Sequence, residues 1–410
     1  MTILRKFFRI ILMILNLLLV IVVLFAVWQY LWGKKYTLRT PKKFEGKCWY
    51  NPYAGTDENG WIKANFHVHS NVWGNLTNGR HSNPHTIDSL YHWLGYEVAC
   101  ISDYQSINRL FSNTAGYLPV YEHGYGPARI HHQVIGAKSV NWKEYLLPQS
   151  LHNRQEVIDC LREDSDAVVV MNHPEFSLAV NPTDFRFLGN YHNMEILSRV
   201  RQSMASWDTA LSSGYPAFAT ANDDGHDIRN LMEVGKNLTL LYARPSEASV
   251  KKALKSGMTI AVDLPIEQDS SLAFRKKLLQ QLRGPASLSM QGDTLRVRFS
   301  RIFSQLSIKS QGGKTVFMKQ NDSTAVYVAA DEDTYLRTEL TFQDGTRFFL
   351  NPVFRYHGKS LSATTHTPNN FLTMVFRSVA LQVLALLVFF FYLRFKHVRR
   401  KKSHRHPSGL

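Results

Sequence analysis

Two long apolar runs lie near the ends of the 410-residue chain. Residues 10–28 carry no charge, and at ~1.5 Å per residue this run is long enough to cross the ~30 Å hydrocarbon core of a membrane. A cleaved signal peptide is the alternative, but its apolar region spans only roughly 7 to 15 residues, and no small-x-small cleavage site follows here. The second run, at residues 371–393, is interrupted by Arg377. The pattern predicts one transmembrane helix at each end, at residues 8–33 and 371–393.

Between residues 61 and 263, short apolar runs of strand character alternate with stretches that have helical spacing. The apolar runs are residues 64–68, 97–101, 134–137, 167–171, 194–197, 217–221, 238–242 and 259–262. The helical stretches include residues 154–163, 204–212 and 246–256. Such alternation is typical of an α/β fold with a parallel sheet, and seven or eight strands favour a closed barrel. We therefore predict a barrel domain at residues 44–265.

Helical spacing stops after about residue 272. Residues 295–299 and 324–328 alternate apolar and polar positions with period two, and residues 335–342 and 347–349 add two further strands. Glycine-rich turns such as Asp344-Gly345 separate these strands. The pattern predicts a small antiparallel β-sandwich at residues 272–360, between the barrel and the second apolar run.

The formal charge of +16 first suggests a nucleic-acid partner, but its distribution excludes this interpretation. Residues 1–43 hold eight basic side chains, the tail at 394–410 holds seven, and neither segment holds an acidic one. The intervening 350 residues carry 33 basic and 32 acidic side chains. Basic clusters beside two apolar runs predict an integral protein of the cytoplasmic membrane, with both termini cytoplasmic and the catalytic domain extracytoplasmic, or periplasmic. Membrane lipids are then the partners of the basic ends.

Histidines concentrate in the predicted barrel, where 12 of the 17 fall between residues 67 and 226. His67 and His69 are two positions apart, so in a strand their side chains share a face and can chelate one cation. Ionisable groups also follow later apolar runs. They are Asp103, Glu122, His173, Asp224 and His226. In a β/α barrel the carboxyl ends of the strands form the face that carries chemistry.

Imidazole and carboxylate ligands without cysteine suit Zn²⁺, Mn²⁺ or Fe²⁺. One bridging carboxylate can hold two cations ~3.5 to 4 Å apart, and such a pair makes hydroxide available at neutral pH. The pattern thus favours a metal-dependent hydrolase that uses a metal-bridged hydroxide. A P-loop, a dinucleotide fingerprint, a serine-nucleophile elbow and a nucleic-acid motif are all absent from the sequence. The three cysteines Cys48, Cys100 and Cys160 leave at most one disulfide.

The order of these motifs resembles the PHP (polymerase and histidinol phosphatase) superfamily over roughly residues 61–263, and is most similar to its carbaryl-hydrolase-like branch. The motifs are His67-x-His69, residues 95–104, Glu122 with residues 131–136, Asn172-His173-Pro174, residues 194–197 with Trp207, and Asp224-Gly225-His226. The resemblance implies a distorted (β/α)7 TIM-like barrel, two or three divalent metal ions and, in most members, phosphoesterase activity.

The resemblance also implies roles for single residues. His67, His69 and Asp224 would bind the first metal, Glu122 would bridge, and His131 and His173 would hold the second. His226 would contact a third metal or the substrate phosphate. The alternative to His131 is His132, but the spacing to Gly136 favours His131.

The sequence departs from the family at two places. Ser102-Asp103-Tyr104 replaces Thr-Asp-His, and the Ser-Asp-Gly that normally follows His-x-His is disrupted, so a two-metal centre is favoured over three. Tyr104 either donates a hydrogen bond to a phosphoryl oxygen or fills space. Asp103, Tyr104 and His226 are the candidate catalytic residues, and Glu195 is expected to orient a metal ligand.

The predicted function is a membrane-anchored phosphoesterase acting on an anionic small-molecule or envelope-associated phosphoester. One alternative is hydrolysis of a carboxylic ester, carbamate or amide at the same metal site. Another is a degenerate PHP module with a binding or sensing role. No nucleic-acid partner is expected.

Overall fold

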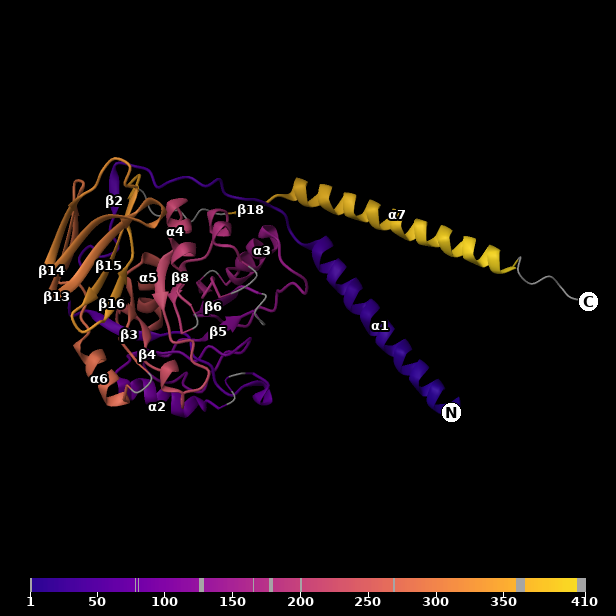
Figure 1. The fold of residues 1–410 in the computed structure, drawn as a ribbon, viewed down its shortest axis with the longest axis horizontal. Helices are drawn as coiled ribbons and strands as arrows, with labels where there is room; N and C mark the ends of the chain where they lie inside the picture. Colours follow the sequence, from indigo (N-terminus) through magenta and orange to yellow (C-terminus); the bar gives the residue numbers. More distant parts are fainter. Residues whose placement is uncertain are drawn as a thin grey trace, which may run out of the picture. The chain divides into compact units, whose positions relative to one another are not determined.

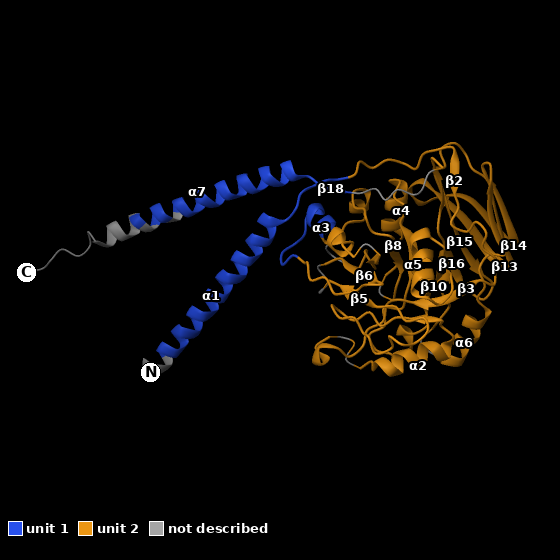
Figure 2. Ribbon diagram, turned by 180° about the vertical axis from the view of Figure 1, so that it is seen from behind, with its two compact units in different colours: residues 1–38, 145–156, 366–410 blue, residues 39–144, 157–365 orange. Residues whose placement is uncertain are grey.

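The computed structural model describes residues 2–77, 79, 81–124, 129–164, 166–176, 180–199, 201–267, 270–358 and 366–403. The chain divides into two compact units (Figure 2). The terminal unit comprises residues 1–38, 145–156 and 366–410. The central unit comprises residues 39–144 and 157–365, and it contains every residue predicted to carry chemistry.

The terminal unit is built on two long helices, α1 (Thr2–Trp32) and α7 (Asn370–Ser403) (Figure 1). Residues Arg5–Trp32 and Asn370–Arg394 are long and apolar enough to span a membrane, as predicted for both ends of the chain. A short antiparallel ladder follows α1 and precedes α7. It pairs β1 (Tyr36–Thr37) with β18 (Thr367–Pro368).

Arg377, the charge that interrupts the second apolar run, has partners within the terminal unit. Its guanidinium donates to the carbonyl of Leu31 from Nε (3.2 Å) and to that of Trp32 from Nη2 (2.8 Å). These carbonyls end α1, where a helix leaves acceptors unsatisfied and favours a positive charge. Arg377 thus joins the two apolar helices at the end of α1.

The central unit contains two sheets. The first has the order β5-β6-β7-β8-β9. The second follows the path β12-β13-β15-β16-β11-β10-β3-β4. In addition, β14 pairs with β13, and β17 pairs with both β15 and β2. The first-sheet strands are β5 (Val120–His123), β6 (His131–Ile135), β7 (Val168–Asn172), β8 (Asn193–Leu197) and β9 (Phe218–Ala221). The second-sheet strands are β2 (Cys48–Tyr50), β3 (Trp61–Asn65), β4 (Val98–Ala99), β10 (Asn237–Tyr242), β11 (Thr259–Asp263), β12 (Ser287–Gln291), β13 (Thr294–Ser310), β14 (Lys314–Val328), β15 (Tyr335–Phe342), β16 (Arg347–Leu350) and β17 (Val353–Tyr356).

The predicted mixed α/β class is confirmed, but among the described strands the ladders do not close into a barrel. The bridges Val68–Gly225 and Tyr104–Glu122 are isolated and extend no ladder. The prediction of a parallel sheet is wrong for the pairs β5–β6, β6–β7, β3–β10 and β10–β11, which are antiparallel. Only seven residues connect β5 to β6, which is too short for the crossover that parallel neighbours need. The pairs β3–β4, β7–β8 and β8–β9 are parallel.

The described residues form five further α-helices. They are α2 (Pro84–Leu94), α3 (Leu151–Leu161), α4 (Met204–Ser212), α5 (Glu247–Ser256) and α6 (Leu272–Gln281). The prediction that helices stop at residue 272 is wrong, since α6 begins there. Ser271 caps it by accepting from the Phe274 backbone N–H at 3.2 Å. Leu278 and Leu279 bury one face of α6 in the core, and this burial stabilises a helix of weak sequence signal.

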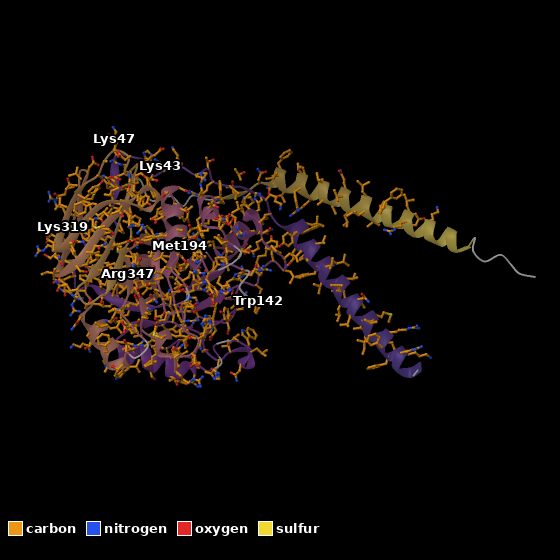
Figure 3. The ribbon with its side chains drawn as sticks, viewed as in Figure 1. Lys43, Lys47, Trp142, Met194, Lys319 and Arg347 are labelled. Atoms are coloured by element: carbon orange, nitrogen blue, oxygen red, sulfur yellow. The ribbon has the colours of Figure 1, made fainter. Side chains whose placement is uncertain are left out.

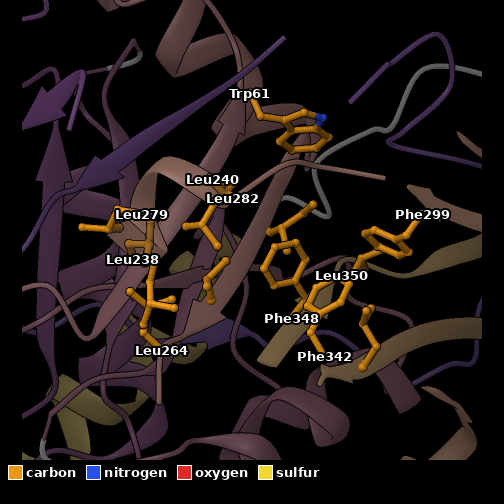
Figure 4. Close-up of a cluster of buried hydrophobic side chains, with 14 of the residues drawn as sticks. Trp61, Leu238, Leu240, Leu264, Leu279, Leu282, Phe299, Phe342, Phe348 and Leu350 are labelled. Atoms are coloured by element: carbon orange, nitrogen blue, oxygen red, sulfur yellow. The ribbon is translucent and has the colours of Figure 1, made fainter. Parts of the chain in front are cut away.

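The strands after residue 287 are antiparallel, as predicted, but they continue the sheet of the preceding region. β16 pairs with β11, which places Ile260 opposite Leu350. One core therefore contains side chains from both regions, and Leu238 and Leu240 share it with Phe342 and Phe348 (Figure 4). The boundary predicted between residues 265 and 272 lies inside this continuous core.

Candidate metal centre

The seven predicted metal ligands come from the ends of five strands. All seven side chains are buried. His67 and His69 follow β3, Glu122 lies in β5, His131 begins β6, His173 follows β7, and Asp224 and His226 follow β9. Residues far apart in the sequence thus approach one another, four of the strands coming from the first sheet and β3 from the second.

These side chains form overlapping groups whose donor atoms all lie within 4.8 Å of one another. The groups are His67–His69–Glu122, Glu122–His131–His173, His69–Asp224–His226 and His67–His173–Glu195. Glu122 belongs to two of them, with His67 and His69 in one and His131 and His173 in the other. Its carboxylate is therefore placed where a bridging ligand between two cations would lie.

Donor separations match those of ligands on a shared cation. His67 Nε2 lies 3.3 Å from Glu122 Oε1 and 3.2 Å from Asp224 Oδ1, and His69 Nε2 lies 3.2 Å from Glu122 Oε2. Two donors at ~2.1 Å from one cation are about 3.0 to 3.4 Å apart at octahedral to tetrahedral angles. Glu122 Oε1, which faces His67, also lies 3.1 Å from His131 Nδ1 and 3.6 Å from His173 Nε2.

Several of these atoms are buried without a hydrogen bond among the residues that the structure describes. They include His67 Nε2, both ring nitrogens of His69 and Glu122 Oε2. A buried polar atom without a partner is costly, and coordination to a cation removes that cost. Nitrogen and oxygen donors without sulfur suit Zn²⁺, Mn²⁺ or Fe²⁺. The residues present therefore fit divalent cations.

The carboxylates of the centre are held in their charged form. Burial opposes ionisation of Glu122, but the adjacent imidazoles of His67 and His131 hold the pKa of that carboxyl well below its usual value. Burial also opposes ionisation of Asp224, whose pKa is nevertheless lowered by His67 and His69. Ionised carboxylates are the form that binds a cation.

Glu195 orients two of the donors, as the sequence led us to expect. Its Oε1 lies 3.0 Å from His67 Nδ1, and its Oε2 accepts from the backbone N–H of His173 at 3.1 Å. Asn222 donates to the same Oε1 at 2.9 Å. A carboxylate on Nδ1 fixes the imidazole so that Nε2 faces the cation.

Two of the donors occupy strained backbone. His173 has φ 26° and Asp224 has φ 50°, in the left-handed region that residues other than glycine seldom adopt. Such strain persists only where the surroundings impose it, and it is common at functional sites. Here the hydrogen bond from the His173 N–H to Glu195 helps to impose it.

Asp103 and Tyr104 take different positions. Asp103 accepts from the backbone N–H (2.6 Å) and the hydroxyl (2.7 Å) of Ser70, and it is in none of the donor groups of the described residues. It therefore positions the loop that follows His69. The Tyr104 ring stacks on His69 with centroids 4.4 Å apart, and its hydroxyl lies 3.3 Å from His226 Nε2.

The structure brings His131, and not His132, into the donor groups. The two residues are neighbours in β6, so their side chains leave opposite faces of the strand. The buried His132 ring lies 5.8 Å from that of His123. Burial, together with the neighbouring His123, holds the pKa of His132 well below its usual value, so this imidazole is neutral.

Sequence reasoning missed two asparagines that support the centre. Asn172 donates to Glu122 Oε1 at 3.0 Å, and Asn222 accepts from the Phe66 backbone N–H at 2.7 Å. Each stands beside an ionisable residue at the end of an apolar run, and this position was the available signal. Gln133 also donates to the Phe66 carbonyl at 2.6 Å, which fixes the backbone just before His67.

We predict that the purified full-length protein binds two divalent cations per chain, counted by elemental analysis. Replacing the shared carboxylate in Glu122→Gln should remove most of the bound metal, because both groups lose a charged ligand. The control is His85→Ala, which removes an exposed imidazole outside the donor groups and should leave the count unchanged. Less than one cation per wild-type chain, or an unchanged count in Glu122→Gln, would contradict this assignment.

Neither a protein-family model nor a curated protein matches the sequence. The assignment of this centre therefore depends on the donor atoms, their burial and their separations.

Proposed function

We propose that this protein is a membrane-anchored, metal-dependent phosphoesterase of the PHP class. The observation that supports the proposal is the position of Glu122 in two donor groups, each of which adds two imidazoles. When bound, two divalent cations at such a site activate water and neutralise the charge that develops on phosphoryl oxygens. The remaining roles belong to the side chains of this chain.

Tyr104 is the residue best placed to act on a substrate beside the centre. Its hydroxyl lies next to His226, and its ring is held against His69. In this proposal the hydroxyl donates a hydrogen bond to a phosphoryl oxygen. This hydrogen bond becomes stronger as negative charge grows on the oxygen in the transition state. Asp103 acts only indirectly, because Ser70 occupies its carboxylate.

We further propose that the two sheets form the distorted (β/α)7 barrel expected of the class, with incomplete ladders. The bridges Val68–Gly225 and Tyr104–Glu122 support this, since each links segments that carry the donors. Convergence of donors beyond the ends of β3, β7 and β9 supports it as well, because β/α barrels place their chemistry there.

The expected activity is phosphate release from aryl phosphates or aryl phosphodiesters by the full-length protein loaded with Mn²⁺ or Zn²⁺. Tyr104→Phe should lower kcat about 10²-fold, the typical loss when one transition-state hydrogen-bond donor is removed, with unchanged metal content. The matched control is Tyr242→Phe, which removes a hydroxyl that bonds Asp57.

Hydrolysis of aryl esters without phosphate release would replace the phosphoesterase proposal by the ester, carbamate or amide alternative. A metal-loaded protein inactive on every substrate would instead favour the binding or sensing module. Equal activity of Tyr104→Phe and the wild type would remove Tyr104 from the mechanism.

We propose that both termini are cytoplasmic and that the central unit lies outside the cytoplasm. Support comes from the basic residues at the cytoplasmic end of each apolar helix in this orientation, which are Arg5, Lys6 and Arg9 at the first helix and seven residues in 394–410 after the second. Lys34 and Lys35, which follow the first helix, argue weakly against this orientation, but charges leading into a very long translocated segment count for little. In this orientation the metal centre faces extracytoplasmic phosphoesters. The basic ends would contact anionic lipid headgroups of the cytoplasmic leaflet.

The native thiols test this orientation, because Cys48 of the central unit is exposed whereas Cys100 is buried. A membrane-impermeant maleimide should label right-side-out vesicles of the cytoplasmic membrane at Cys48 and leave sealed inside-out vesicles unlabelled. Cys48→Ser, which leaves the buried Cys100 and the half-buried Cys160, should remove most of the label. Labelling of inside-out vesicles alone would reverse the proposed orientation.

A further inference from the structure

Large apolar side chains are exposed next to the metal centre. Trp73 is 50% exposed, Trp142 is 61% exposed and Phe176 is 43% exposed. We call these three residues the aromatic rim. Exposed apolar residues that stand singly are ordinary, but connected ones around a site indicate a binding surface.

Two members of the aromatic rim connect to the centre through Tyr104. The Trp142 and Trp73 rings pack edge to face, with centroids 6.2 Å apart. Trp73 donates from its indole N–H to the Tyr104 carbonyl at 2.7 Å, and the Tyr104 ring stacks on His69. A short series of contacts therefore links a metal ligand to the exposed Trp142, which Figure 3 labels.

Phe176 adjoins the other donor group. Its ring lies 5.6 Å from the His173 ring in an edge-on arrangement, and its backbone N–H donates to the His173 carbonyl at 2.8 Å. His173 belongs with Glu122 and His131, whereas His69 belongs with Glu122 and His67. The aromatic rim thus adjoins both donor groups that contain Glu122, directly at His173 and through Tyr104 at His69.

The backbone around Trp73 is strained. Trp73 has φ 54°, Gly74 has φ 62° and Asn75 has φ 65°, so three successive residues are in the left-handed region. A bulky residue with positive φ is a genuine outlier, and such strain is found where a site requires it. The turn holds the Trp73 indole exposed while its N–H reaches Tyr104.

A bilayer is the source of apolar chains that this protein would meet. The protein carries two helices, Arg5–Trp32 and Asn370–Arg394, that are long and apolar enough to span a membrane. Exposed aromatic side chains beside a phosphoester site then favour an occupant that comes from that bilayer.

We propose that the substrate is an amphiphile, a phosphoester head group on a long apolar chain, taken from the membrane. The head group binds at the metal centre, and the first part of the apolar chain lies against the aromatic rim. The choice of head group rests on the proposed function, whereas the choice of an apolar chain rests on the rim. The charge of the metal centre then favours the phosphoester head group, and burial of the aromatic rim favours the apolar chain. A molecule that has both parts is therefore preferred.

The test measures binding of octylphosphonate and methylphosphonate, which share a non-hydrolysable head group, to the metal-loaded full-length protein in amphipol by calorimetry. We expect octylphosphonate to bind at least tenfold more tightly. Trp142→Ala should weaken the binding of both phosphonates unequally: the fold-loss of affinity for octylphosphonate should be about ten times the fold-loss for methylphosphonate. The matched control is Trp93→Ala on α2, since Trp93 is similarly exposed (47%) and contacts Lys276.

The outcomes separate the two proposals. If neither phosphonate binds the metal-loaded protein, the head-group assignment, and with it the proposed function, fails. If both bind with equal affinity, or if Trp142→Ala and Trp93→Ala behave alike, the aromatic rim does not bind the apolar chain while the proposed function stands. The kcat/KM of the octyl ester of 4-nitrophenyl phosphate should likewise exceed that of the methyl ester.

Discussion

The structure depends on one electrostatic constraint, which is that buried carboxylates and imidazoles lie in contact with one another. Glu122 is fully buried, and its oxygens face ring nitrogens of His67, His69, His131 and His173 at 3.1 to 3.6 Å. Burying even one ion costs several kcal/mol unless it is paired and hydrogen-bonded. Some of these donor atoms lack such a bond among the described residues, and a cation bound among them would satisfy them together.

The surrounding fold holds the donors in place. The donors come from separate strands, so the ladders β3–β10 and β5–β6–β7–β8–β9 set their separations. Glu195, Asn172 and Asn222 then fix single atoms of the donors by hydrogen bonds. The surrounding residues also hold His173 and Asp224 in their strained backbone conformations. The continuous core behind these strands, shared with the antiparallel region, gives the site its rigid support.

Local features of the centre were readable from the sequence, and long-range ones were not. The donors were predicted because ionisable residues follow apolar runs in the sequence. The two-residue spacing of His67 and His69 predicted that their side chains share one face of a strand. Strand direction was misjudged because β5 and β6 form a hairpin, and pairing depends on connection geometry as well as on hydrophobic pattern. Alternation in β6 separates His131 from His132 but does not say which faces inward. The role of Asn222 depends on contacts with residues far away in the sequence.

The central claim is that Glu122 holds two cations close together, and X-ray absorption on the zinc-loaded full-length protein tests it most directly. The account predicts a first shell of nitrogen and oxygen at ~2.0 to 2.2 Å without sulfur. It also predicts a zinc–zinc distance of ~3.5 to 4 Å that disappears in Glu122→Gln. A sulfur shell at ~2.3 Å, or a wild-type spectrum without a second zinc within this distance, would contradict it.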